Sequence, residues 1–173
     1  RLNTKKGCVY EVAQWFPRVA VYDDVQGWNT MPYLGAGEFY LEYGDIEFNI
    51  TAPSDLIIVG SGELLNAKDC YTGEQVKRWE AAAKSNTTVT IRSAEEVGKN
   101  NSRPAAAELI WKFKITNTRD AAWAASKAFI IDAAKIDLPS GKKCMAISAY
   151  AEESIGKNGW QRSTEMIKGS IEH

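Results

Sequence analysis

Strict alternation of apolar and polar residues is the strongest pattern in this chain. Between residues 107 and 115 one face collects Ala107, Leu109, Trp111, Phe113 and Ile115. Charged and polar residues at 108, 112, 114 and 116 fall on the other face. Because successive side chains of a strand point to opposite faces, this pattern predicts an antiparallel strand with one buried side.

A second alternating region covers residues 39–50. Apolar residues occupy every second position from Phe39 to Tyr43, and again from Ile46 to Ile50, on either side of Gly44-Asp45. The Gly-Asp pair fits either a two-residue hairpin turn or a bulge in one long strand. The pattern leaves both open, but either one makes this region β.

Shorter runs extend the β prediction along the chain. Residues 56–60, LIIVG, predict a short strand that is buried on both faces. Further strands are expected at residues 9–13, 88–92, 128–133 and 143–150. Helices are fewer: residues 74–84 are rich in helix formers, and Ser93-Ala-Glu-Glu96 resembles a capping box that opens a short helix. The chain is therefore predicted to be mainly β, with short helices.

The last segment differs in kind from the rest. Asn158 with Gln161 fits a helix N-cap, and Trp160, Ile167 and Ile171 recur at helical spacing. We therefore expect a C-terminal helix and a domain junction near residue 153, with a β-domain over residues 1–152 and a linker plus helix over residues 153–173.

Composition and charge exclude some classes of function. The 173 residues carry a net charge of −1, which argues against a nucleic-acid partner, and no apolar run is long enough for a membrane span. The three cysteines form no metal-binding or C-x-x-C pattern, and we expect them to be small buried residues with at most one bridge. Because the chain begins with Arg1 and shows no targeting segment, we expect it to be a segment of a longer protein.

Four stretches together resemble a known family. They are QWFPRVAVYDDVQGWN from residue 14, EFYLEYGDIEFNITAPSDLIIVGSGEL from residue 38, TRDAAWAASKAF from residue 118 and GWQRSTEMIKGSIEH from residue 159. They are similar to the N-terminal β-domain, and the start of the catalytic domain, of zinc aminopeptidases related to aminopeptidase N and leukotriene A4 hydrolase. The likeness is greatest to a bacterial, extracytoplasmic branch of that family. It implies a saddle-like, sandwich-type stack of antiparallel sheets and a periplasmic or otherwise extracytoplasmic location.

The resemblance implies that the chemistry lies elsewhere in the parent enzyme. Enzymes of this family hydrolyse N-terminal peptide bonds with a zinc ion held by H-E-x-x-H and a later glutamate. This chain has one histidine, His173, and no such motif. We therefore expect no catalytic residue, metal ligand or cofactor in this chain, zinc in the full-length parent, and two partners: the catalytic domain of the same polypeptide and the peptide substrate.

Gln14 is the sharpest candidate for a substrate-binding residue. In the family, a Glu or Gln of the β-domain accepts hydrogen bonds from the free α-amino group of the substrate. A side-chain carbonyl suits this task because an ammonium group has three donors and no acceptor. The spacing from Gln14 to Arg18 is one residue shorter than in well-known members, so Glu11 is the fallback, and a polar strand-end residue is the alternative without function.

Four further residues are candidates for the interface with the catalytic domain. Trp15 and Arg18 belong to the same signature stretch as Gln14, although Val-Tyr-Asp-Asp replaces the usual Pro-Cys-Phe-Asp-like run after them. Arg119 and Asp120 resemble a stretch that buttresses the seam between the two domains through a partly buried Arg–Asp pair. For Asp23-Asp24 a structural turn is favoured over a calcium site, which needs about six oxygen ligands.

A rival interpretation comes from a different class of function. The chain could be a stand-alone β-sandwich that binds carbohydrate or protein at a cell surface. Exposed tryptophans on one sheet face would favour this binding module. Buried tryptophans, with an apolar patch around Trp15, Trp28 and the C-terminal helix, would favour the peptidase domain.

Overall fold

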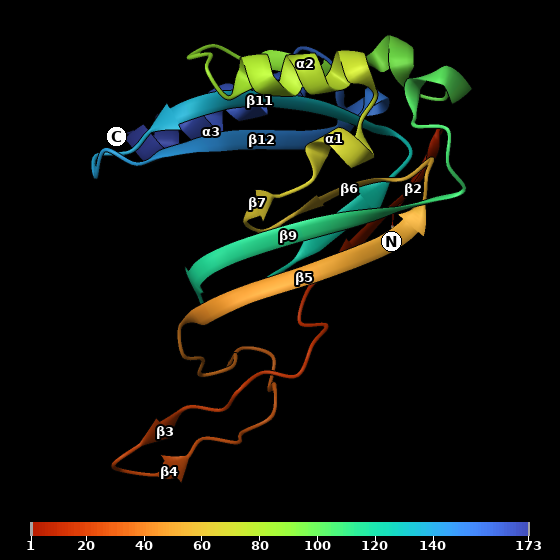
Figure 1. The fold of residues 1–173 in the computed structure, drawn as a ribbon. Helices are drawn as coiled ribbons and strands as arrows, with labels where there is room; N and C mark the ends of the chain where they lie inside the picture. Colours follow the sequence, from red (N-terminus) through yellow and green to blue (C-terminus); the bar gives the residue numbers. More distant parts are fainter. Residues whose placement is uncertain (1, 173) are drawn as a thin grey trace.

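The chain is mainly β, as the alternation predicts. The computed structural model describes residues 2–172, and Figure 1 shows antiparallel sheets stacked in layers, with short helices on top and a long arm below. The described residues form three sheets in the body and a small hairpin in the arm. The prediction of stacked antiparallel sheets with short helices and one C-terminal helix is confirmed.

The first sheet is built on the alternating strand. Leu109, Trp111 and Phe113 of this strand are buried, and the charged residues between them are exposed. The sheet has the order β5-β9-β7, and its register shifts between Gly44 and Ile46. The Gly-Asp pair is therefore a bulge. Its strands are β5 (Gly44–Pro53), β9 (Glu108–Thr118) and β7 (Glu63–Leu64).

The alternation at residues 39–43 does not give a strand. These residues form one isolated bridge, between Ala20 and Leu41, and three of their large side chains are exposed. The prediction for this stretch is wrong because a strand needs a partner that continues the ladder, and the neighbouring segment passes it only once. Apolar alternation alone does not show whether a stretch has a partner strand.

The second sheet lies in the middle of the molecule. Its order is β1-β2-β10-β6 and all its pairings are antiparallel. The predicted LIIVG strand is its edge strand, and Ile57 and Ile58 are fully buried. The strands are β1 (Leu2–Thr4), β2 (Gly7–Val12), β10 (Trp123–Ser126) and β6 (Ile57–Gly60).

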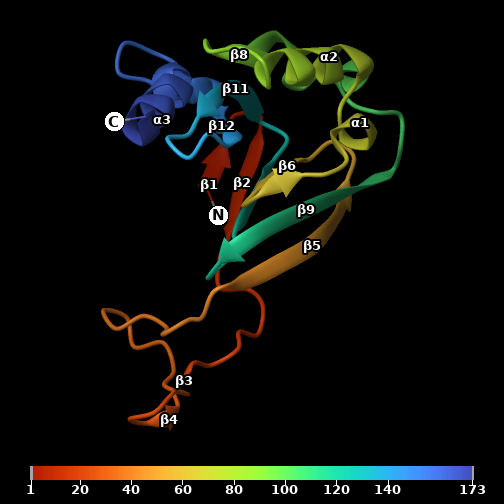
Figure 2. The ribbon, with the colours of Figure 1, turned by 60° about the vertical axis from the view of Figure 1, so that its left-hand side comes forward.

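The third sheet carries the two longer helices. It has the order β12-β11-β8, and α2 and α3 pack against it (Figures 1 and 2). Lys168 Nζ donates to the carbonyl of Lys135, and Thr164 bonds Ser148 inside the packing. The elements are β8 (Val89–Arg92), β11 (Phe129–Asp137), β12 (Lys143–Ala151), α2 (Gly73–Ala82) and α3 (Ser163–Glu172).

The helix ends follow the capping rules, with one exception. The capping box predicted at Ser93 and Glu96 forms at the short turn η1, and a second one, Thr72 with Gln75, begins α2. The cap expected at Asn158 does not form, because the Gln161 amide bonds both backbone groups of Gly156 instead. The remaining helical elements are α1 (Ala67–Cys70), η1 (Ala94–Glu96), η2 (Asn100–Ser102), η3 (Glu152–Ser154) and η4 (Trp160–Arg162).

One apolar core joins the three sheets. Trp111 is completely buried at its centre, with the ring of Tyr71 edge-on to it at 5.4 Å. Phe48 and Phe113 stack at 5.1 Å across the β5–β9 pair. Aromatic pairs at this spacing add to the burial of apolar area, so β9 ties the layers together.

The arm is the part of the chain that leaves the core. We use this name for residues 14–43, which run out from the body and back (Figures 1 and 2). Its tip is a hairpin of β3 (Tyr22–Asp23) and β4 (Gly27–Trp28). Asp23 accepts hydrogen bonds from the backbone N–H groups of Val25 and Gln26 and from the Asn29 amide. Asp23 is thus the structural turn residue that the sequence indicates.

Gly62 offers a test of the packing between β6 and β9. It has φ +87°, and a Cβ there would lie 2.3 Å from the carbonyl oxygen of Lys114. Gly62→Ala should lower the free energy of unfolding by roughly 2–4 kcal/mol, since it adds a backbone clash to the strain of a left-handed residue. Urea denaturation measures this loss.

Gly141→Ala is the matched control for Gly62. Gly141 has φ +79° but open space around its Cβ position. Gly141→Ala should lower the free energy of unfolding by only about 1 kcal/mol, because it adds the strain of a left-handed alanine without a steric clash. Equal losses for the two variants would mean that the close approach to Lys114 contributes nothing.

The three cysteines should differ in reactivity. All three are free; Cys70 is buried and Cys144 is exposed. Burial is the main cause that raises the pKa of the Cys70 thiol to about 11. Because the thiolate is the reactive form, iodoacetamide at pH 8 should alkylate Cys144 fastest and Cys70 slowest, as read by peptide mass spectrometry. In urea the three cysteines should be alkylated at similar rates. Rapid alkylation of Cys70 in the native protein would contradict its burial.

Candidate functional site

Gln14 occupies an unusual backbone position at the root of the arm. Two residues after the end of β2, its φ is +52°, a region that residues other than glycine seldom adopt. Its side chain is exposed and makes no hydrogen bond within residues 2–172. The side-chain amide of Gln14 is therefore open to solvent and free to bond a ligand.

Gln14 borders a cavity of about 420 Å³ at the root of the arm. Both the outgoing and the returning segments of the arm contribute to its wall. The lining includes Gln14, Phe16, Arg18, Asn29, Met31 and Phe39. Two of the sequence candidates, Gln14 and Arg18, thus share one concave site.

Arg18 fastens the arm to the body. Its Nη2 lies 2.6 Å from Oδ2 of Asp120, and its side chain is only 10% exposed. The guanidinium also lies 5.0 Å from the ring centre of Phe39, on the returning segment of the arm. Since a guanidinium combines a charged fork with a flat stacking face, Arg18 joins three parts of the chain at one point.

The partly buried Arg–Asp pair has a different arginine from the one expected. Asp120 pairs with Arg18 and also accepts from the N–H of Ala121. Arg119 points elsewhere and donates to the hydroxyl of Tyr43, with its guanidinium 4.7 Å from that ring. Consecutive side chains of an extended segment point to opposite sides, so Arg119 and Asp120 reach different partners.

Trp15 connects the arm to the core surface. Its Nε1 donates to the carbonyl of Ala121 at 2.9 Å. Its ring packs edge-on against Phe16, Phe48 and Trp123. The side chain is still 37% exposed, so one part of the indole remains on the surface beside the arm.

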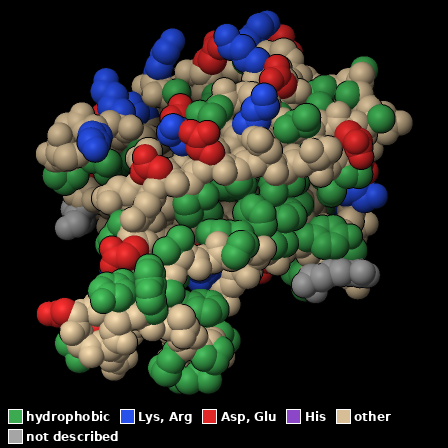
Figure 3. All heavy atoms as spheres, turned by 60° about the horizontal axis from the view of Figure 1, so that its bottom comes forward, with side chains coloured by type: hydrophobic (Ala, Val, Ile, Leu, Met, Phe, Trp, Pro, Cys, Tyr) green, Lys and Arg blue, Asp and Glu red, His purple; other side chains and the backbone are tan. Residues whose placement is uncertain are grey.

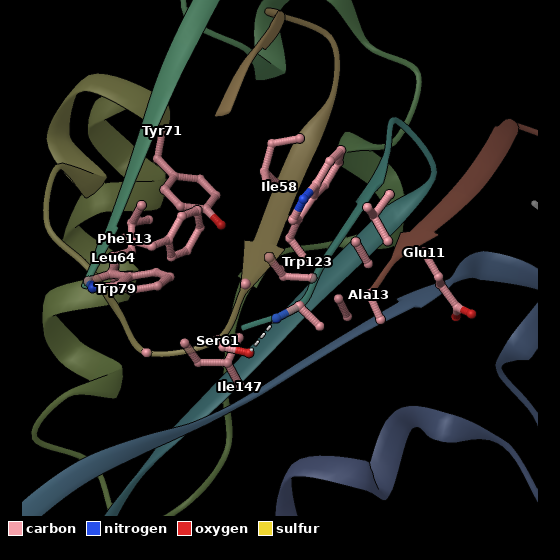
Figure 4. A pocket seen from close by; sticks show the side chains of 17 residues that line it. Glu11, Ala13, Ile58, Ser61, Leu64, Tyr71, Trp79, Phe113, Trp123 and Ile147 are labelled. Atoms are coloured by element: carbon pink, nitrogen blue, oxygen red, sulfur yellow. Dashed lines mark hydrogen bonds between the residues drawn. The ribbon is translucent and has the colours of Figure 1, made fainter. Parts of the chain in front are cut away.

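Glu11, the fallback candidate, borders a different cavity from that of Gln14. It is an exposed residue of β2 at the edge of a cavity of about 490 Å³ between the sheets. Figure 4 shows that its carboxylate points away from Tyr71, Trp79 and Phe113, which line the other side. The structure thus separates the two candidates that lie three residues apart in the sequence.

Sequence patterns gave no sign of this second cavity. Its wall comes from β2, β6, β7, β9, β10, β12 and α2, and its lining is mostly apolar. The lining residues do not follow one another in the sequence, because each strand contributes only one or two side chains to the wall. A contact between distant elements can be found only after folding.

The arm carries most of the exposed apolar surface. Large apolar side chains cover both of its segments, and Figure 3 shows them gathered on the face where the arm projects. Singly exposed apolar residues are common, but exposed apolar residues that gather on one face are typical of interaction surfaces. The set comprises Val19, Tyr22, Val25, Trp28, Met31, Tyr33, Leu34, Phe39, Tyr40 and Tyr43.

The tryptophans fit neither expected arrangement completely. Trp111 is buried, whereas Trp15 and Trp28 of the arm and Trp160 of η4 are exposed. No single sheet face within the described residues displays them together. The patch around Trp15, Trp28 and the C-terminal helix that would favour the peptidase domain does not form, because α3 packs on the sheet at the end of the body opposite the arm (Figure 1).

Metal and membrane features can be stated for the described residues only. Within residues 2–172, no group of three or more His, Cys, Asp or Glu side chains is placed to hold a metal ion. No helix in that range is long and apolar enough to cross a membrane. His173 lies outside the described residues.

Comparison of the chain with protein-family models, with curated proteins and with solved structures found no match. The resemblance to the aminopeptidases therefore rests on the residues of the four stretches themselves.

The ion pair of Arg18 and Asp120 should control the mobility of the arm. Asp120→Asn removes the countercharge of a nearly buried guanidinium, and should lower the local free energy of arm opening by about 1–2 kcal/mol. Amide hydrogen exchange over residues 16–22 measures this change. Asp24→Asn, an exposed carboxylate of the same arm, is the matched control. Equal exchange in both variants would show that the pair does not hold the arm.

Proposed function

We propose that this chain is the N-terminal β-domain of an aminopeptidase N-like zinc metallopeptidase, extending into the start of its catalytic domain. In this proposal the β-domain forms one wall of the active-site cleft, and the Gln14 amide accepts hydrogen bonds from the free α-amino group of the peptide substrate. The rest of the parent polypeptide supplies the zinc and the hydrolytic chemistry.

The observation that carries the proposal is the state of Gln14. A left-handed backbone at a residue other than glycine costs about 1–3 kcal/mol, and such positions cluster at binding sites. The Gln14 amide has no hydrogen-bond partner among the described residues, and it borders a cavity. An amide that is held by strained backbone and left without a partner is suited to a ligand.

The charge around Gln14 agrees with a neutral acceptor at this point. Arg18 lines the same cavity, but its charge is already matched by Asp120. The carbonyl oxygen of an amide can accept from an ammonium group without adding a further charge. The α-ammonium group of the substrate can therefore be bound by Gln14 without an additional carboxylate in the cavity.

The exposed apolar side chains of the arm support the proposal that a large protein domain covers it in the parent enzyme. Tyr22 and Trp28 pack edge-on at 5.2 Å near the tip, yet both are more than half exposed. A catalytic domain of the same polypeptide would cover this surface permanently, which makes its exposed apolar area tolerable. Trp15, Arg18, Arg119 and Asp120 lie at or near the root of the arm and would border that interface.

The proposal assigns no metal and no catalytic step to this chain. Zinc would be bound by residues of the parent, and the peptide would contact this domain only through its amino end. On the family resemblance we also propose a periplasmic or otherwise extracytoplasmic location for the parent. The tryptophans do not decide against the stand-alone binding module: Trp15, Trp28 and Trp160 are exposed, although they do not form a row on one sheet face.

Gln14→Ala in the enzyme that contains this chain tests the proposal. The Michaelis constant for an aminoacyl p-nitroanilide should rise at least about tenfold, since a charge-assisted hydrogen bond contributes roughly 1.5–3 kcal/mol. Zinc content, measured by atomic absorption, should stay unchanged. An N-acetylated substrate analogue, which lacks the ammonium group, should bind equally weakly to both forms.

Gln26→Ala provides the control for this test. Gln26 is an exposed glutamine of the same arm, away from the lining of the cavity. It should leave the kinetics unchanged. If Gln14→Ala also leaves them unchanged, or if the polypeptide contains no H-E-x-x-H motif, the proposed function is wrong; the same measurements on Glu11→Ala test the fallback.

A further inference from the structure

A separate cavity on the body is surrounded by positive charge. It measures about 440 Å³ and lies where the loop after η1 meets the turn after β5. Five of its lining side chains are cationic and one is a carboxylate, Asp55. The cations are Lys6, Arg92, Lys99, Arg103 and Lys127. For a chain with a net charge of −1, this is an unusual local excess.

Arg92 forms the floor of this cavity with its charge unmatched. The side chain belongs to β8 and is only 2% exposed. Its Nη1 donates to the backbone carbonyls of Lys127 and Phe129, while its Nε is buried and has no partner in the described residues. Carbonyl groups satisfy part of the guanidinium but do not neutralise it.

Arg103 repeats this arrangement a short distance away. Its Nε and Nη2 donate to the carbonyls of Ser54 and Leu56, and its Nη1 is buried without a partner. Its guanidinium lies 5.8 Å from the ring centre of Trp111. The packing therefore fixes the direction of the guanidinium plane.

The two arginines repel each other in a poorly solvated place. Desolvation by burial lowers the pKa of Arg103 to about 10, and the neighbouring charge of Arg92 contributes to the shift. Desolvation also lowers the pKa of Arg92. The nearest acid to Arg92, Glu96, is already bonded to Arg78 through both of its oxygens. Among residues 2–172, neither arginine and none of the three lysines forms an ion pair.

A purely structural role explains only part of this cluster. Each arginine bonds two backbone carbonyls, which gives the two buried arginines a structural role. The three lysines are exposed around it, and nothing in the packing requires positive charge at all three positions. Five cations against one carboxylate are instead complementary to an anion that carries more than one negative charge.

We propose that this cavity binds the phosphate group of a small soluble molecule. A phosphate monoester is largely dianionic at neutral pH and offers three acceptor oxygens, which suits two fixed guanidinium groups better than a single carboxylate would. The volume leaves room for a group attached to the phosphate. The inference is independent of the proposed peptidase function, since no residue of the cavity belongs to the Gln14 site.

Calorimetric titration of the chain at pH 7.5 tests the proposal, with sodium phosphate and glycerol 3-phosphate as separate probes. Sodium chloride at equal ionic strength serves as the reference. Both phosphate probes should bind at one site, and tighter binding of glycerol 3-phosphate would identify an ester as the natural class. If neither binds more tightly than chloride, the proposal is overturned.

Two triple variants locate the site. K6Q/K99Q/K127Q changes only exposed side chains at the mouth of the cavity and should weaken phosphate binding at least tenfold. K112Q/K142Q/K157Q removes the same charge from exposed lysines elsewhere and should leave the affinity within twofold. Equal losses in the two variants would show that phosphate responds to overall charge and not to this cavity.

Arg103→Lys separates the guanidinium fork from its charge. It keeps a cation beside Trp111 but loses the planar donors, so phosphate affinity should fall at least fivefold. Circular dichroism and urea denaturation of the same sample show whether the variant is folded. A folded Arg103→Lys chain with unchanged affinity would contradict the role of Arg103.

Discussion

Burial of the Trp111 side chain is the constraint on which the rest of the structure depends. The indole is inaccessible to solvent, and the ring of Tyr71 packs against it from the segment that leads into α2. Trp111 also lies next to the guanidinium of Arg103, which bonds the turn after β5. A side chain of this size can be covered only by several elements at once, so its burial fixes β9 relative to both the helical layer and the loops.

The arm shows the opposite situation, in which few contacts determine a large surface. Its fixed points lie at the root: the Trp15 indole on Ala121, the Arg18–Asp120 pair and the Arg119–Tyr43 contact. Beyond them the apolar side chains are exposed. An extended segment of this kind gains little from its own packing, and its stability in isolation depends on a handful of polar interactions. Gln14 directly precedes Trp15 in the chain, so the proposed binding residue and the proposed interface lie beside the same contacts.

Three arginines in this chain have different electrostatic surroundings. Arg18 is nearly buried but has Asp120 as its countercharge, and it serves as an anchor. Arg92 and Arg103 are held by backbone carbonyls, with no carboxylate bonded to either among the described residues. A buried charge without a countercharge is costly, and an anion that occupies the cavity would reduce this cost. Because its charge is matched, Arg18 has a structural role in the arm. Because their charges are not matched, Arg92 and Arg103 are the proposed phosphate-binding residues.

The sequence by itself determined the local elements of this protein. Alternation at residues 107–115 predicted β9, helix-forming residues predicted α2, the capping box predicted η1, and Asp23-Asp24 predicted a turn, because each depends on neighbours within a few residues. Only the tertiary structure decided that residues 39–43 lack a strand partner, that Asp120 pairs with Arg18, that Glu11 and Gln14 border different cavities, and that Lys6, Arg92 and Arg103 meet around one cavity. These outcomes depend on which distant segments become neighbours, and neither periodicity nor residue spacing carries that information.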